Sequence, residues 1–203
     1  SSYPITVSVS DGVNTVTQDI TINITDVNEP PSFGSSAVFS AAENQTSIGR
    51  VIVGDQEGDS LTYTLSGADA NSVSILTSGS DVGTLTFNSA PDYETKNTYS
   101  FTLSVTDGTN TSTQDITVNI TNVNEAPIIT SASSFDAAEN QSAVGTVTAT
   151  DADGDDLTFT VTGFEIQISS TGVLTFLNDS RDYETQSSYP ITVSVSDGVN
   201  TVT

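Results

Sequence analysis

Cysteine, methionine, tryptophan and histidine are all missing from this chain. Without cysteine there is no disulfide or thiolate, and without histidine there is no imidazole for acid–base chemistry or zinc binding. Stability must therefore come from packing or from bound ions. Basic residues are scarce as well: Arg50, Lys96 and Arg181 stand against 26 acidic residues, for a formal net charge of −23. Such a chain repels phosphate backbones and anionic lipid, so we expect no nucleic-acid partner.

Long apolar runs are also absent, so we expect no direct membrane insertion of this segment. What the chain has instead is internal repetition. Residues 1–17 (SSYPITVSVSDGVNTVT) return without change at 187–203, and residues 15–31 recur in diverged form at 111–127, an offset of 96. A repeat of this length is a whole domain and not one turn of a solenoid.

The repeats predict three segments. Residues 1–29 are the last hairpin and linker of a preceding repeat, 30–125 form one repeat, and 126–203 form a second repeat that lacks most of its final strand. Two interpretations of this frame stay open. The chain is an excerpt of a longer covalent array, or it is a whole subunit whose last repeat is completed by strand donation from Ser1–Thr25 of a neighbour, which would grow a filament.

Alternating apolar residues predict strands throughout. The stretch 98–106 places Tyr99, Phe101, Leu103 and Val105 on one face, and a turn at Asp107-Gly108 leads into a second alternating run. Further short strands are expected near 47–54, 60–66, 73–77 and 83–88, with counterparts near 143–150, 156–162, 164–169 and 172–177. The pattern predicts an all-β chain of tandem seven-stranded Greek-key β-sandwiches, an Ig-like architecture, joined end to end.

The acidic residues occupy the same places in both copies. A glutamate (Glu43 or Glu139) is expected at the end of a first strand, acids follow a second strand, a DYET loop precedes the final hairpin, and an aspartate lies in its turn. Each motif alone is a common turn, but the ordered set recurs in two diverged copies. Because strand ends of a sandwich alternate between two poles, we expect these groups to gather at the poles.

Clustered carboxylates repel one another and raise each other's pKa unless a cation joins them. Oxygen ligands in such number suit a hard ion that takes six to eight of them, which means Ca²⁺ before Mg²⁺. Zinc is a poor candidate because there is no histidine or cysteine to bind it. The sequence therefore predicts bound Ca²⁺.

The ordered set resembles the cadherin repeat, specifically the cadherin-like repeats of large bacterial surface adhesins or extracellular fibres. The matching motifs are AEN at Glu43, DYE at 92–94, VTD at 105–107 and NVNEAP at 122–127, and the resemblance covers essentially the whole chain. It implies Ca²⁺ between consecutive repeats and an extracellular, cell-surface location. It also implies that the partners are neighbouring repeats of the same array, with homotypic filament contacts as a further option.

Carried over residue by residue, the resemblance implies three ligand sets. The complete junction comprises Glu43, Asp92, Glu94, Asn124, Glu125, Asp151, Asp153 and Asp197. The first junction is partial, with Asp26, Asn28, Glu29, Asp55, Glu57 and Asp107. The last is partial too, with Glu139, Asp182 and Glu184. Asn122 stands where the first junction has Asp26, and DQE replaces DxD in the first copy. We expect two or three ions at the complete junction and fewer at the first.

These inferences predict a calcium-rigidified extracellular stalk or filament of a bacterial adhesin. An alternative is a binding module, either for carbohydrate or for a like repeat. Sugar sites need exposed aromatic side chains, and here most fall at inward strand positions; Tyr93 and Tyr183 are expected to pack in the core. Paired carboxylates could hydrolyse glycosides, but the calcium interpretation already explains these acids, so we expect no enzymatic activity.

Overall fold

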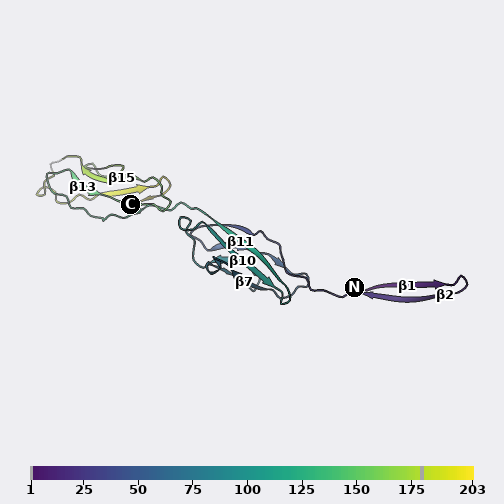
Figure 1. The fold of residues 1–203 in the computed structure, drawn as a ribbon. Coiled ribbons are helices and arrows are strands. Elements are labelled where there is room, and N and C mark those ends of the chain that lie inside the picture. Colours follow the sequence, from purple (N-terminus) through teal and green to yellow (C-terminus); the bar gives the residue numbers. More distant parts are fainter. Residues whose placement is uncertain (1, 179–180) are drawn as a thin grey trace. The chain divides into compact units, whose positions relative to one another are not determined.

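The structure is a computed structural model that describes residues 2–178 and 181–203 (Figure 1). Its contacts divide the chain into two compact units. Unit 1 consists of Ser1–Ala41, Gln45–Ala90 and Thr98–Asn119. Unit 2 consists of Ala42–Asn44, Pro91–Asn97 and Ile120–Thr203. The described residues are nearly all β, apart from one short 3₁₀ helix, η1 (Ala70–Ser72).

Unit 1 opens with an antiparallel hairpin of β1 (Ser2–Ser10) and β2 (Thr15–Asn23). Its turn is closed by the Asp11 carboxylate, which accepts hydrogen bonds from the backbone N–H groups of Val13 and Asn14 at 2.8 and 2.6 Å. Every residue of both strands is exposed. The hairpin therefore pairs with itself and contributes nothing to a core.

The remaining strands of the first repeat form two main sheets and one short pair, with orders β4-β11-β10-β7, β5-β9-β8 and β3-β6. Their bounds are β3 (Ser32–Phe33), β4 (Val38–Ala42), β5 (Ser47–Arg50), β6 (Val53–Gly54), β7 (Thr62–Ser66), β8 (Val73–Ile75), β9 (Thr84–Phe87), β10 (Thr98–Thr106) and β11 (Thr111–Thr121). The segment expected near 47–54 switches sheets, because β5 pairs with β9 while β6 pairs with β3. Counting β3–β4 and β5–β6 as single switching strands gives the seven that the sequence predicts.

The core of the first repeat follows the alternation read from the sequence. On β10, Phe101 is 3% exposed, and Leu103 and Val105 are fully buried. On β11, the inward residues Ile116 and Val118 are buried as well. These two strands pair in register, with Phe101 opposite Ile116 (Figure 1). The fold class predicted from the sequence, an all-β sandwich, is confirmed; the Greek-key connections and the end-to-end arrangement stay predictions.

The second repeat, in unit 2, has counterparts of all these strands except β4, in the orders β13-β17-β16, β15-β18-β19 and β12-β14. Their bounds are β12 (Ile128–Ile129), β13 (Ala143–Thr146), β14 (Ala149–Thr150), β15 (Thr158–Thr162), β16 (Ile166–Ile168), β17 (Val173–Phe176), β18 (Thr192–Ser196) and β19 (Thr201–Val202). A cluster of Val147, Ile166, Leu174 and Phe176 forms its core. In both repeats a glycine allows close packing: a Cβ on Gly83 or Gly172 would lie 2.2 or 2.1 Å from the carbonyl oxygen of Val51 or Val147.

One expected strand is absent from the described part of the second repeat. The segment 134–138, counterpart of β4, is irregular, so the prediction that Glu139 ends a first strand is wrong. In the first repeat β4 pairs with β11, which is eleven residues long. The counterpart of β11 is β19, which has two residues and neighbours only β18. Among the described residues, segment 134–138 therefore has no counterpart of β11 beside it.

Candidate metal centre

Glu43 is a buried carboxylate held by backbone groups. Its side chain is 3% exposed, and its own N–H donates to the carbonyl of Thr121 at the end of β11, at 3.1 Å. One carboxylate oxygen accepts from the N–H of Tyr93 at 2.8 Å and the other from the N–H of Val123 at 2.7 Å. Such hydrogen bonds fix the direction of the carboxylate.

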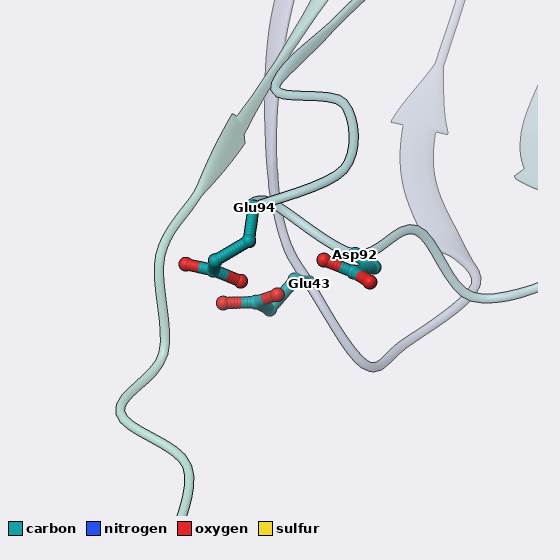
Figure 2. Close-up of side chains that lie close together, drawn as sticks. All are labelled: Glu43, Asp92 and Glu94. Carbon is teal, nitrogen blue, oxygen red and sulfur yellow. The ribbon is translucent and has the colours of Figure 1, made fainter. Parts of the chain in front are cut away.

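The DYET loop brings two more carboxylates to Glu43. The Asp92 carboxylate accepts from the hydroxyl and the N–H of Thr95, at 2.9 and 3.0 Å, and these bonds hold the pKa of Asp92 below its usual value. Glu43, Asp92 and Glu94 each offer an oxygen within 4.8 Å of the others. Figure 2 shows the three side chains converging from two loops.

Glu94 also belongs to a second cluster, with Glu125 and Asp153. The N–H of Glu125 donates to Asp153 at 2.8 Å, and the side-chain amide of Asn44 donates to Glu125. Desolvation raises the pKa of Glu94, and repulsion from the carboxylates of Glu43, Asp153 and Glu125 raises it further. The neighbouring carboxylates therefore disfavour negative charge at Glu94, and a bound cation would offset this repulsion.

A third cluster joins Asp153 to Asp151 and Asp155. Asp155 is not among the ligands expected from the sequence, although the DADGDD motif places three aspartates at alternate positions. Desolvation raises the pKa of Asp155, with added repulsion from Asp151 and Asp153. The three clusters form a chain, because Glu94 is shared by the first two and Asp153 by the last two. All their members lie in unit 2.

Asn124 and Asp197 lie together but outside these clusters. The Asn124 amide donates to Asp197 at 2.9 Å, and the other oxygen of Asp197 accepts from the N–H groups of Val199 and Asn200. In this structure Asp197 shapes its turn and anchors the linker. The eight residues predicted for the complete junction thus divide into six that cluster and two that support the linker.

The first junction repeats part of this geometry within unit 1. The Asn28 amide donates to Asp107 at 2.8 Å, as Asn124 does to Asp197, and the N–H of Glu29 donates to Glu57 at 3.3 Å. The Asp55 carboxylate accepts from the N–H of Glu57 at 3.1 Å. Asp26 is exposed. Among the described residues, none of the three-carboxylate clusters includes a member of this set.

The last set does form a cluster. Glu139, Asp182 and Glu184 lie within the same 4.8 Å limit, and all three are exposed. The Glu139 carboxylate accepts from the N–H of Tyr183 at 3.2 Å. This cluster is the counterpart of the one around Glu43, but its glutamate is on the surface instead of buried.

The donor set fits a calcium ion. Three carboxylate oxygens are buried and have no hydrogen-bond partner among the described residues: Asp55 Oδ2, Glu125 Oε2 and Asp151 Oδ2. Buried polar atoms in native proteins are nearly always satisfied, so an unsatisfied anionic oxygen marks a place for a cation or for water. Oxygen atoms from the seven carboxylates of the three linked clusters match the ligand type that Ca²⁺ prefers.

Comparison with known proteins places this geometry on a recognisable fold. The structure of human CDH23 EC21-23 is 22% identical, with a TM-score of 0.67, over 98% of this chain and 69% of that one. Human Protocadherin-24 EC1-2 is 21% identical, with a TM-score of 0.55, over 83% of this chain and 86% of that one. The fold is that of the cadherin repeat. The resemblance read from the sequence is thus confirmed at the level of the fold.

Sequence comparisons agree with this assignment. Residues 28–121 match the family described as Bacterial Ig domain. The Fat-like cadherin-related tumor suppressor homolog of Drosophila melanogaster is 35% identical over 39% of this chain. Chitinase A of Pseudoalteromonas piscicida is 29% identical over 86% of this cadherin-like chain. The chain spans 21% of the length of that chitinase and 2% of the Drosophila protein.

Across the residues that the structure describes, no helix has the length and apolar character needed to cross a bilayer.

Proposed function

We propose that the linked carboxylate clusters of unit 2 bind calcium, and that the chain is a spacer segment of an extracellular stalk or filament on a bacterial surface. The observation that carries the proposal is the chain of three clusters joined through Glu94 and Asp153. The unsatisfied oxygens of Glu125 and Asp151 support it, because a bound cation would satisfy both.

The ligands come from both sides of the boundary predicted at 125/126. Glu43, Asp92 and Glu94 precede it, Glu125 belongs to the linker, and the aspartates of the 151–155 loop follow it. When bound, Ca²⁺ supplies positive charge that offsets the mutual repulsion of these carboxylates. If these carboxylates all hold calcium, the two loops and the linker that carry them must stay together. The junction would therefore be stiff with calcium and flexible without it.

The proposed location follows from calcium supply. Extracellular calcium modules bind at roughly 10⁻⁴–10⁻³ M, a range that extracellular Ca²⁺ can fill. At ten times Kd, an ion stabilises the bound form by about 1.4 kcal/mol per site. Likeness to the extracellular cadherin domains of Protocadherin Gamma B2, at 22% identity, supports such a setting, and the Bacterial Ig domain match supports a bacterial one. Neighbouring repeats would be its partners.

Limited proteolysis tests the stiffening role. With millimolar calcium, cleavage within 122–127 should be slow. Chelation with EGTA should accelerate this cleavage and lower the mean radius of gyration measured by small-angle scattering, because a flexible junction allows bent shapes. Glu94→Gln should behave like the EGTA sample even with calcium present. Asp81→Asn removes one charge from an exposed loop outside the clusters and should behave like the unsubstituted chain. Equal cleavage with calcium and with EGTA would contradict the proposal.

A second candidate function is carbohydrate binding. Tyr183 is 67% exposed, so the prediction that it packs in the core is wrong, and Phe164 is 99% exposed. Exposed aromatic rings are the platforms on which sugars stack, and the match to a chitinase suggests chitin as the first ligand to try. A chitin pull-down that retains the chain but not Tyr183→Ala would support this role. Neither proposal assigns a catalytic reaction to the chain.

A further inference from the structure

Asn44, which follows the buried Glu43, has a backbone conformation that few residues adopt. Its φ is +61°, in the left-handed region. Among the described residues other than glycine, only Asn44 and Asn140 have a positive φ, and they occupy the same place in the two AEN motifs. Most side chains are strained in this conformation, whereas asparagine tolerates it. Asparagine at this position therefore has a backbone role, and its side chain has a second one.

The side-chain amide of Asn44 contacts the linker. It donates a hydrogen bond to Oε1 of Glu125, which lies 81 positions further along the chain. Oε2 of the same carboxylate is buried and has no hydrogen-bond partner in the described part of the chain. Glu125 belongs to the cluster with Glu94 and Asp153. Its two oxygens thus differ, because one is held by an amide and the other remains available to a ligand.

Asn44 is itself held in place by its main chain. Its N–H donates to the carbonyl of Pro91, just before the DYET loop, at 3.0 Å. The preceding residue, Glu43, is bonded to Thr121 at the end of β11 and accepts hydrogen bonds through both of its carboxylate oxygens. Because the backbone that carries the amide is already fixed, the bond to Glu125 costs little further conformational entropy.

The main chain of Glu125 is fixed as well. Its N–H donates to Asp153 at 2.8 Å, and its carbonyl accepts from the side-chain amide of Asn124 at 3.0 Å. The freedom that remains to Glu125 lies in its side-chain torsions. The bond from Asn44 restricts these torsions and so determines where the carboxylate points.

We propose that Asn44 is a positioning residue for calcium, which holds Glu125 so that Oε2 is the oxygen offered to the ion. This inference rests on the proposed function and adds a residue that acts through a ligand without binding the metal. The partners of ligating carboxylates orient them, and loss of such a partner commonly weakens metal binding by about 10- to 100-fold. An amide suits this role because it donates a hydrogen bond without adding negative charge to the cluster.

Glycine at position 44 separates the backbone role from the side-chain role. Asn44→Gly keeps the left-handed conformation, which glycine adopts without strain, and removes the amide. Asn44 is exposed, so the substitution removes no core packing. In a calorimetric titration of the full chain, it should weaken calcium binding by about tenfold. Asn140→Gly is the matched control, because it makes the same backbone change away from Glu125; its calcium affinity should stay within about twofold of that of the unsubstituted chain.

A double-mutant cycle distinguishes positioning from a general loosening of the turn. Glu125→Ala removes the acceptor of the Asn44 amide. In that background, Asn44→Gly should weaken calcium binding by less than about twofold, because the two side chains act as one unit. A substitution that only loosened the turn would weaken binding about equally in both backgrounds. Equal losses in the two backgrounds would therefore overturn the proposal.

NMR spectra of the chain in EGTA test the hydrogen bond without the metal. The side-chain amide signal of Asn44 is identified by its loss in Asn44→Gly. This signal should shift in Glu125→Ala, because the amide loses its carboxylate acceptor, whereas the side-chain signal of Asn140 should not move. An Asn44 signal that is the same with and without the Glu125 carboxylate would contradict the proposed contact.

The outcomes distinguish this inference from the proposed function. If the unsubstituted chain binds calcium and Asn44→Gly binds it equally well, the proposed function stands and the positioning role is overturned. If the unsubstituted chain shows no saturable calcium binding, the proposed function fails, and the positioning role fails with it. Weaker binding by Asn44→Gly that disappears in the Glu125→Ala background supports both.

Discussion

Residues 1–17 and 187–203 have the same sequence but different surroundings. Val9 is 62% exposed in the first copy, and Val195, the same residue of the second copy, is fully buried. Both copies form strands, so alternation of apolar and polar residues is enough to set the local structure. Burial differs because β18 pairs with β15 as well as β19, over the core of unit 2, whereas β1 pairs with β2 alone.

A third version of this segment, in β10 and β11, is covered on both sides. Leu103 and Val118, the counterparts of Val7 and Ile22, are fully buried in the first repeat. The three versions differ in the number of strands around them. β1 pairs only with β2, β18 lies between β15 and the short β19, and β10 lies between β7 and the long β11. The core is thus a property of the partners that a strand finds and not of the strand's own sequence.

The identical copies predict unequal effects of the same substitution. Val195→Ala removes two buried methyl groups and should lower the free energy of unfolding of the second repeat by about 2 kcal/mol. Val9→Ala should change stability by less than about 0.5 kcal/mol, because its side chain is mostly in water. Urea unfolding followed by circular dichroism, at low protein concentration, measures both. Equal losses for the two variants would mean that the hairpin is packed in solution.

Glu43 is buried and its counterpart Glu139 is exposed, so the same substitution at the two positions compares the two repeats. Glu43→Ala leaves the N–H groups of Tyr93 and Val123 without an acceptor in a buried place, which should cost about 1–2 kcal/mol. Glu139→Ala removes one exposed acceptor and should cost less than about 0.5 kcal/mol. Hydrogen exchange at the amides of Tyr93 and Tyr183 provides the local measurement. If Glu139→Ala proves as costly as Glu43→Ala, the segment before Glu139 is as ordered as β4.

The pKa shifts predict a smaller, pH-dependent contrast. The pKa of Glu94 is raised and that of Asp92 is lowered, so Glu94 takes up a proton before Asp92 does as the pH falls. Calcium must then displace that proton, and its affinity should fall. Without calcium, lowering the pH has the opposite effect on the fold. Because the folded-state pKa of Glu94 is raised, protonation of Glu94 increases the free energy of unfolding as the pH falls through that pKa.

Calcium titrations at about pH 7 and pH 5 measure this effect, with Glu94→Gln as the comparison. The variant lacks the titrating group, so its weaker calcium affinity should depend less on pH. An equal loss of affinity in both proteins would assign the pH dependence to other carboxylates.

Much of the fold follows from sequence because its signals are local. The alternation at 98–106 predicts β10 with its inward residues, and the Asp-Gly turn is formed by the Asp107 carboxylate accepting from the backbone at 109 and 110. The strand before Glu139 could not be predicted reliably, because it depends on a partner far along the chain. Sequence repetition suggested the strand, but pairing decides whether it forms.

In the candidate site, too, the features with local sequence signals are the predictable ones. Glu43, Asp92, Glu94, Glu125 and Asp153 were predicted from motif order, and the structure brings them into clusters. Asp155 was missed because the family motif has two aspartates, although the DADGDD text offers a third at the same spacing. The position of Tyr183 after Asp182 predicts a core side chain, but in the structure this tyrosine is exposed. Loop side chains depend on backbone turns that sequence spacing does not specify.

A calorimetric calcium titration of the 203-residue chain tests the central claim, that the clusters joined by Glu94 and Asp153 hold calcium. The account predicts saturable heat from at least two ions, with Kd of about 10⁻⁴–10⁻³ M, and markedly weaker binding in Glu94→Gln but not in Asp81→Asn. No saturable heat at calcium concentrations up to about 10 mM, or identical titrations of the two variants, would contradict it.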